Sequence, residues 1–274
     1  MTRLIKEDIC EIENMIETYD KLFKDQTGKT MDEIAKAAAG LRRLAKHRPV
    51  SVIPVTSGLG IIDTFADMVA VILKYIKVDA KSTEHTDVSG LKEAYDNESK
   101  IVFMADDDTF LATSLYGCAM SDNGDATGRG FATALLEAMR YRKIDPQEQK
   151  ILILGAGPVG SAAVETMIDA KAVPVVYDPD TEKLKQLKQI YNDNVVCLEV
   201  PPQYIQYRFI LDASTAGDII GEDDVTGDTV IAAPGMPCAA TREACQKACV
   251  IHNPLELGVI TMYYQVIAQI QKSC

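Results

Sequence analysis

The order of apolar and polar residues divides the first part of the chain into two helices. Apolar side chains recur every three or four residues and fall on one helical face, beginning with Ile5, Ile9, Ile12 and Ile16. A second helix is predicted from about Met31 to Leu44, after the polar turn at 27–30. Residues 1 to 48 are therefore predicted to form a helical layer, which either packs on the rest of the chain or covers a cleft or a partner subunit.

From Pro49 onward, short apolar runs alternate with helical stretches, which is typical of an α/β protein. The segment 121–130 is rich in Gly, Asp and Asn, and it is interpreted as a flexible connection. A domain boundary is predicted at 144–150, around Asp145-Pro146. The predicted elements before this boundary are strands at 50–55 and 101–105 and helices at 61–76, from Asp87 onward, and at 130–143.

The chain is organised around residues 151–178, with the sequence ILILGAGPVGSAAVETMIDAKAVPVVYD. An apolar strand passes directly into glycines spaced G-x-G-x-x-G, a helix follows, and a second strand ends in an acid. This order predicts a dinucleotide site, with the pyrophosphate at the helix N-terminus. Gly155 would make the tight turn, Gly157 would let the pyrophosphate approach, Gly160 would let the helix pack, Pro158 fits the first helical turn, and Asp178 would bind the ribose hydroxyls.

Asp178 has a second interpretation that does not exclude the first. The pair Asp178-Pro179 would also serve as the N-cap and first residue of the helix predicted after it. As a ribose ligand, Asp178 would repel a 2′-phosphate, and no arginine stands beside it in the sequence. The sequence therefore favours NAD over NADP.

Further strands after the glycine-rich unit complete a small doubly wound sheet, at 195–200, 209–213, 229–235 and 250–258. The loops that hold Ser214, Ala216 and Pro234 leave two of these strands and are predicted near the cofactor. A last helix, over 259–271, is predicted to return to the first domain. The predicted fold class is α/β, with a Rossmann-type NAD-binding domain over 149–255 and an α/β substrate domain over 1–148 that includes the N-terminal helical layer and the returning segment 256–274.

Two polar turns follow the strands of the first domain. Thr56 and Ser57 open a turn whose hydroxyls and N–H groups suit a substrate carboxylate, or simply cap the following helix. Asp106, Asp107 and Asp108 follow the strand at 101–105, where an open α/β sheet places its ligands. These acids suit an ammonium group, or form a solvated acidic loop. The sequence alone leaves both pairs of alternatives open.

Composition and charge narrow the class of protein. With 274 residues, 47% hydrophobic and 25% charged, the chain is long enough for two soluble domains. No apolar run is long enough for a membrane span, and acids stand where a signal peptide would be apolar, so we expect a cytoplasmic protein. The net charge of -12 argues against binding to nucleic acid or anionic membranes.

The cysteines and histidines offer little for metal or acid–base chemistry. The 7 cysteines are scattered without C-x-x-C spacing, so we interpret them as reduced thiols and expect no metal site. Only 3 histidines occur, and each is interpreted as structural or exposed. His252 is the exception to follow, because it ends a predicted strand near the cofactor.

Six segments, in this order over nearly the whole chain, resemble the pyrrolysine synthase (PylD) family, the dehydrogenases that complete pyrrolysine biosynthesis. They are IPVTSGLGII (53–62), DVSG (87–90), MADDDTFLA (104–112), GAGPVG (155–160), APGMPCA (233–239) and NPLELG (253–258). The resemblance implies NAD-dependent oxidation of the terminal amine of 3-methylornithyl-N6-lysine, with ammonia loss and pyrroline ring closure. It also implies substrate contacts at Thr56, Ser57 and Asp106, closure of the helix around Leu4 and Ile5, and NAD contacts at Gly157, Pro158, Val159 and Asp178.

The chain departs from this family near its last strand. A glutamate can precede the Pro-Leu pair there, whereas this chain has Asn253 in that position and Glu256 beyond the pair. Which of the two faces the substrate is left open. The competing functions are another NAD-dependent amino-acid or amine dehydrogenase and an NAD(H)-binding redox sensor without turnover. A homodimer is expected from the apolar face of the N-terminal helix.

Overall fold

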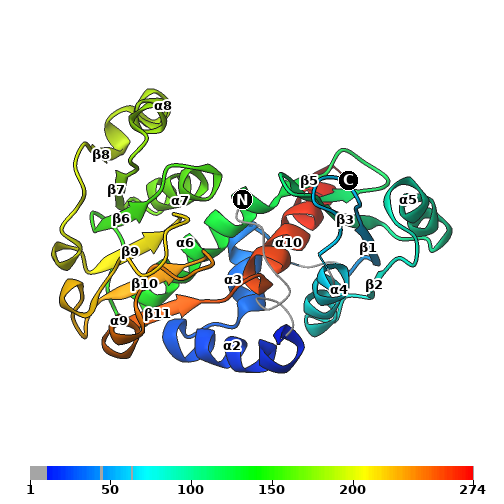
Figure 1. Cartoon of the computed structure of the whole chain (residues 1–274), viewed down its shortest axis with the longest axis horizontal. Helices are drawn as coiled ribbons and strands as arrows, with labels where there is room; N and C mark the ends of the chain where they lie inside the picture. The colour runs from blue at the N-terminus through cyan, green and yellow to red at the C-terminus, as the bar shows by residue number, and fades with distance from the viewer. Residues whose placement is uncertain (1–10, 44–45, 63, 274) are drawn as a thin grey trace. The chain divides into compact units, whose positions relative to one another are not determined.

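The computed structural model describes residues 11–43, 46–62 and 64–273 and forms two compact units (Figure 1). The first unit comprises 1–20, 31–127 and 255–274, and the second comprises 21–30 and 128–254. Helices α2 (Ile12–Thr27) and α6 (Asn123–Tyr141) each contribute residues to both units. The domain boundary expected near residue 148 stays a prediction.

The second unit is built on a six-stranded parallel sheet with the order β11-β10-β9-β6-β7-β8. When the strands of this unit are renumbered from β6 as the first, their order across the sheet is that of a Rossmann fold. The predicted fold class is therefore confirmed. The chain order reverses between β6 and β9, and such folds bind nucleotides at the carboxyl ends of the two strands beside this point. The strands are β6 (Lys150–Leu154), β7 (Val173–Tyr177), β8 (Val196–Leu198), β9 (Phe209–Asp212), β10 (Val230–Ala233) and β11 (Cys249–His252).

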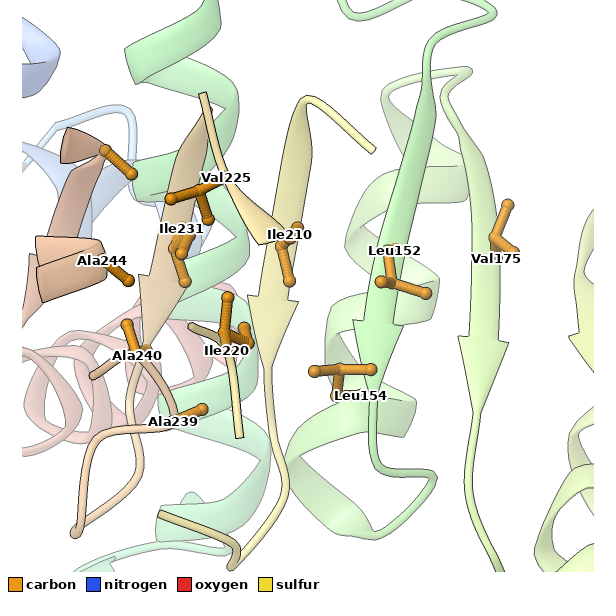
Figure 2. Packing of buried hydrophobic residues seen from close by; sticks show 12 residues of the cluster. Leu152, Leu154, Val175, Ile210, Ile220, Val225, Ile231, Ala239, Ala240 and Ala244 are labelled. Atoms are coloured by element: carbon orange, nitrogen blue, oxygen red, sulfur yellow. The ribbon is translucent and has the colours of Figure 1, made fainter. Parts of the chain in front are cut away.

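An apolar cluster on one face of this sheet forms a core of the second unit (Figure 2). Residues paired in register on adjacent strands point to the same face, so Leu152, Ile210 and Ile231 share this face. Each of these side chains is fully buried, which stabilises the fold by roughly 1.5–3 kcal/mol per side chain. Alanines around α9 (Arg242–Lys247) and residues beside the 3₁₀ turn η3 (Glu222–Asp224) cover the cluster. The unit also holds α7 (Pro158–Asp169), α8 (Thr181–Tyr191), and the 3₁₀ turns η1 (Asn192–Asn194) and η2 (Tyr204–Gln206).

The first unit has a five-stranded sheet with the order β2-β1-β3-β4-β5. Strands β1 to β3 are parallel, and β4 and β5 extend the sheet antiparallel to its edge. A buried aromatic group joins the sheet to a helix, because Phe110 lies 5.3 Å from Phe65 and 6.1 Å from Phe103 between ring centroids. The strands are β1 (Val50–Pro54), β2 (Ala80–Ser82), β3 (Ile101–Ala105), β4 (Phe110–Ser114) and β5 (Met120–Asp122), and the helices are α3 (Met31–Ala38), α4 (Phe65–Tyr75), α5 (Asp87–Asp96) and α10 (Glu256–Ser273).

The interpretation of 121–130 as a flexible connection is wrong, because α6 begins at Asn123. The Asp122 carboxylate accepts hydrogen bonds from Gly124 N at 2.8 Å and Asp125 N at 3.3 Å, and so satisfies free N–H groups of the first turn. Gly128 serves packing, since an added Cβ would lie 2.2 Å from the Val159 carbonyl oxygen of α7. Glycine here marks the close approach of two helices.

Several element bounds also differ from their predictions. Helix α3 ends at Ala38 because Gly40 has a φ of +64° and Leu41 N donates to Lys36 O at 2.9 Å, which closes the helix. Helix α4 begins at Phe65 and α10 begins at Glu256. Strands β2, β4 and β5 and helix α9 were not predicted.

The N-terminal helical face is only partly described. Ile12 and Ile16 are buried on one face of α2, as predicted, whereas Ile5 and Ile9 lie outside the described residues. Among the described helices, none combines the length and the apolar composition that a membrane span requires.

Candidate functional site

In the second unit, a glycine-rich turn joins β6 to α7. Gly155 has a φ of +96°, and an added Cβ would lie 2.6 Å from the Ala213 carbonyl oxygen. A Cβ on Gly160 would lie 2.0 Å from the Gly155 carbonyl oxygen. Both positions therefore require glycine, the first for the tight turn and the second for the close packing of the helix.

The start of α7 offers open space for an anion. Gly157 is the N-cap and Pro158 is the first helical residue. Apart from Gly157 and its two chain neighbours, no heavy atom of the described residues lies within 4 Å of an added Cβ at Gly157. Because the first N–H groups of a helix have no partner within the helix, they and the helix dipole favour a negative group at this end. Val159, which follows Pro158, is half-buried. The turn and the start of the helix fit a pyrophosphate.

Asp178 links the glycine-rich turn to the end of β7. Its side chain is 7% exposed, Oδ2 accepts from Ala156 N at 2.8 Å, and Oδ1 accepts from Asp180 N at 2.8 Å. The interpretation of Asp178 as the N-cap of the next helix is wrong, because Asp180 caps α8 by accepting from Glu182 N at 3.0 Å. Lys183 Nζ lies 4.0 Å from Asp178 Oδ2, a neighbouring cation that the sequence analysis missed.

The loop that follows β9 contains Ser214 and Ala216, and the loop that follows β10 begins with half-buried Pro234. Asp212, the last residue of β9, was missed by the sequence analysis, although an acid at the end of the apolar strand FILD was a visible signal. Its Oδ1 accepts from Ser214 N at 3.0 Å and from Ser214 Oγ at 2.7 Å. Burial raises the pKa of Asp212 to about 6, against the lowering effect of these bonds.

In the first unit, three carboxylates hold the turn that follows β1. The Asp87 carboxylate accepts from Thr56 N at 2.9 Å and from Thr56 Oγ1 at 2.7 Å. The Ser57 hydroxyl lies close enough to Asp106 to lower the pKa of that carboxyl, and Leu59 N donates to Asp107 Oδ2 at 2.6 Å. The structure thus brings together Thr56, Ser57 and Asp106, which come from segments about 50 residues apart, at the carboxyl ends of paired strands.

Asp106 is exposed and remains anionic. Its Oδ1 accepts from Thr109 N at 2.8 Å and from Asp108 N at 3.0 Å in the turn between β3 and β4. These two N–H groups, Thr109 foremost, lower the pKa of Asp106, and the Ser57 hydroxyl adds to the effect. The bonds from Thr56 likewise lower the pKa of Asp87. Paired hydroxyls and exposed anions of this kind can bind an ammonium group.

Of the remaining predicted substrate contacts, only Asn253 and Glu256 are among the described residues, and both are buried. Leu4 and Ile5 fall outside the described residues. Asn253 is 1% exposed and Glu256 is 0% exposed. Glu256 begins α10, and its Oε2 accepts from Leu255 N at 3.1 Å, while burial raises the pKa of Glu256 to about 6.

The histidines have separate local roles. His252 Nδ1 lies 2.6 Å from the Ala233 carbonyl oxygen, so this nitrogen carries the proton and donates, and burial lowers the pKa of the ring. His85 pairs with Glu93 at 2.9 Å, and His47 Nδ1 lies 3.3 Å from the Tyr263 hydroxyl. Within the described residues, no group of His, Cys, Asp and Glu side chains is arranged to hold a metal ion.

Comparison with known proteins relates these features to a family. Residues 8–121 match the family described as pyrrolysine biosynthesis protein PylD, N-terminal domain. The pyrrolysine synthase of Methanosarcina barkeri is 31% identical over 97% of this chain and 98% of its own length. That of Methanosarcina acetivorans is 31% identical over 97% of this chain and 100% of its own length. The quinate dehydrogenase of Corynebacterium glutamicum, solved with NAD, has a similar fold, with a TM-score of 0.54 and 12% identity over 81% of this chain and 94% of that one.

Glu256→Gln is expected to change how stability depends on pH. The folded-state pKa of Glu256, about 6, lies above its ordinary value of 4.5, so the wild type loses stability as pH rises from 4.5 through 6. The variant cannot ionise, and its advantage should grow over this range to about 2 kcal/mol at most. Urea unfolding between about pH 4 and pH 8 measures this difference. The exposed Glu243→Gln is the matched control, and a Glu256→Gln advantage that is constant with pH would contradict the expectation.

Proposed function

This chain belongs to the pyrrolysine synthase family, and we propose that it catalyses the last step of pyrrolysine biosynthesis. The reaction is the NAD-dependent oxidation of the terminal amine of 3-methylornithyl-N6-lysine, with ammonia loss and pyrroline ring closure. The exposed Asp106 carboxylate beside the Ser57 hydroxyl, at a strand end where α/β sheets bind ligands, is the observation that carries the proposal. The proposal includes the homodimer and the cytoplasmic location expected from the sequence.

The substrate supplies most of the chemistry. Removal of a hydride from the carbon that bears the terminal amine leaves an imine, and water converts this imine to an aldehyde and ammonium. A second amine of the substrate then condenses with the aldehyde, which closes the ring and releases the water again. The products are pyrrolysine, ammonium, NADH and protons, and bound NAD supplies the hydride acceptor.

The proposed role of Asp106 is to orient the amine. A carboxylate close to an ammonium group favours the charged form and so opposes deprotonation. The lowered pKa also makes Asp106 a weak base, so the removal of the amine proton is not its task. Thr56 and Ser57 place hydroxyl groups beside it, and Asn253 and Glu256 remain candidate substrate contacts. Correct placement of the reacting carbon is itself a large contribution to rate.

The residues of the second unit fit the nucleotide. We propose that Gly155, Gly157, Pro158, Val159 and Gly160 surround the pyrophosphate, that Asp178 accepts from the adenosine ribose, and that Ser214, Ala216 and Pro234 contact the remainder of the cofactor. The open space at Gly157 and the helix N-terminus support the first assignment. The position of the Asp178 carboxylate beside the turn supports the ribose contact. A carboxylate in this position would also repel the 2′-phosphate of NADP.

The proposed reaction can be tested directly. Purified protein incubated with NAD and the methylornithyl-lysine dipeptide should form NADH together with pyrrolysine, detected by absorbance and mass spectrometry. NADH formation with other amines but not with the dipeptide would instead identify another amine dehydrogenase. Binding of NADH without turnover of any amine would point to a sensor.

Asp106→Asn should lower turnover strongly while NAD affinity stays nearly intact. Asparagine keeps an oxygen acceptor for the N–H groups of Asp108 and Thr109, so the turn is retained and only the charge is lost. Misplacement of the amine should reduce kcat on the order of 100-fold. Steady-state kinetics and NADH titration measure the two effects. Asp108→Asn, in the same turn, is the matched control. The assignment would be refuted if Asp106→Asn kept normal turnover while Asp107→Asn or Asp108→Asn lost it.

Asp178→Ser should weaken NAD binding and reduce the preference for NAD over NADP. Loss of a charged acceptor for the ribose hydroxyls should cost NAD about 10-fold or more in affinity. The affinity for NADP should fall less than the affinity for NAD, since Lys183 would then face the 2′-phosphate without the opposing carboxylate. Titration of both nucleotides measures the ratio. Asp180→Ala, which removes the side-chain cap of α8, controls for local unfolding. Unchanged affinities in Asp178→Ser would limit Asp178 to holding the loop.

A further inference from the structure

Asp212 lies at the point where the sheet order of the second unit reverses. It ends β9 directly opposite Leu154, the last residue of β6 before the glycine-rich turn. Ala213 N, the next donor along the chain, donates to Leu154 O at 2.7 Å. The side chain of Asp212 is 0% exposed. An acid is therefore buried beside the turn that we propose to bind the cofactor.

The bonds of Asp212 fix the peptide against which the glycine-rich turn packs. Its Oδ1 accepts both the N–H group and the hydroxyl of Ser214, at 3.0 and 2.7 Å. The same peptide approaches Gly155 closely, since an added Cβ there would lie 2.6 Å from Ala213 O and 3.1 Å from Ser214 N. Movement of Ser214 would therefore displace one wall of the turn.

The loop that follows β10 closes over the same carboxyl group. An added Cβ on Gly235 would lie 3.1 Å from the Ser214 carbonyl oxygen and 3.8 Å from Asp212 Oδ2. Gly235 directly follows Pro234, the proposed cofactor contact of this loop. The carboxyl group of Asp212 thus lies beneath two loops at once.

Packing alone does not account for an acid in this position. Asp212 Oδ2 is buried and accepts no hydrogen bond from the described residues. The titratable groups that interact with it, Tyr204 and Cys238, supply no positive charge. Burial of such an oxygen costs free energy, whereas an apolar side chain would fit the surrounding apolar cluster without this cost.

We propose that Asp212 is a positioning residue of the cofactor site, which acts through Ser214 and the Gly235 loop on the placement of the dinucleotide. This inference rests on the proposed NAD site. It assigns to Asp212 a role that depends on its hydrogen-bond acceptor and not on its charge. Asparagine, which keeps an acceptor oxygen, should therefore replace it, and apolar side chains should not.

Three variants and a control test the role of Asp212. Asp212→Asn keeps the acceptor for Ser214, Asp212→Leu removes it while filling the apolar core, and Asp212→Ala removes it with loss of volume. The exposed Asp228→Ala in the same unit is the matched control. NADH affinity is measured by titration, the KM of NAD and of the dipeptide by steady-state kinetics, and folding by circular dichroism.

NADH affinity and the KM of NAD should each worsen about 10-fold in Asp212→Leu and Asp212→Ala, the loss expected for one anchoring hydrogen bond. Asp212→Asn should stay within about 3-fold of the wild type, and the KM of the dipeptide should not change. Equal affinity in Asp212→Leu and the wild type, equal loss in Asp212→Asn and Asp212→Leu, or failure of both apolar variants to fold would overturn the proposal. Absence of NADH binding by the wild type would instead remove the proposed cofactor.

Discussion

Aspartate carboxylates that accept hydrogen bonds from loop N–H groups hold the strand ends of both units. Loop N–H groups beyond a strand end have no partner in the ladder and must be satisfied elsewhere. In the first unit, Asp87 and Asp107 accept from Thr56 and Leu59. In the second unit, Asp178 accepts from Ala156, and Asp212 accepts from Ser214. Charged acceptors make such bonds stronger than neutral ones, so the loops that carry the candidate sites have defined positions.

Burial and hydrogen bonds shift the pKa values of the acids in opposite directions. Asp106 is exposed and Asp87 is half-buried, and donated hydrogen bonds lower the pKa of each, so both are anions at neutral pH. Burial raises the pKa of Asp212 and Glu256 to about 6. The exposed Asp106 can therefore offer its charge to a cation, in keeping with a net charge of -12, whereas the buried Asp212 and Glu256 accept hydrogen bonds from the neighbouring Ser214 and Leu255 N–H groups.

The Rossmann unit could be predicted from the sequence because each of its signals is local. Strand, turn, helix, strand and acid follow one another within 151–178, and Gly155 and Gly160 are required by contacts inside this stretch or with the residues that follow β9. The start of α6 could not be predicted, because Gly128 is explained by the approach of Val159, which lies about 30 residues away. Strands β4 and β5 were not predicted for a related reason, since they depend on antiparallel pairing, β4 with β3 and β5 with β4.

Site residues were harder to predict than elements, because a residue's role depends on its partners. The sequence analysis offered Asp178 as a possible helix cap, whereas the hydrogen bonds show that Asp180 caps α8 and that Asp178 binds the glycine-rich turn. The place of Asp212 beside the glycine-rich turn follows from the register between β6 and β9, which no local pattern contains. Thr56, Ser57 and Asp106 were assigned by resemblance, and their proximity follows from the pairing of β1 with β3.

The three consecutive acids after β3 show how hydrogen bonds already made can divide roles among like residues. Asp107 binds the Leu59 N–H group and so stabilises the neighbouring turn. The Asp108 side chain is exposed and makes no hydrogen bond to the described residues, so it would lose rotamer freedom on binding a ligand. Asp106 is already fixed by two N–H groups and remains accessible. A carboxylate ordered before the ligand arrives costs less entropy on binding and sets a definite direction, which is what the orientation of a reacting amine requires.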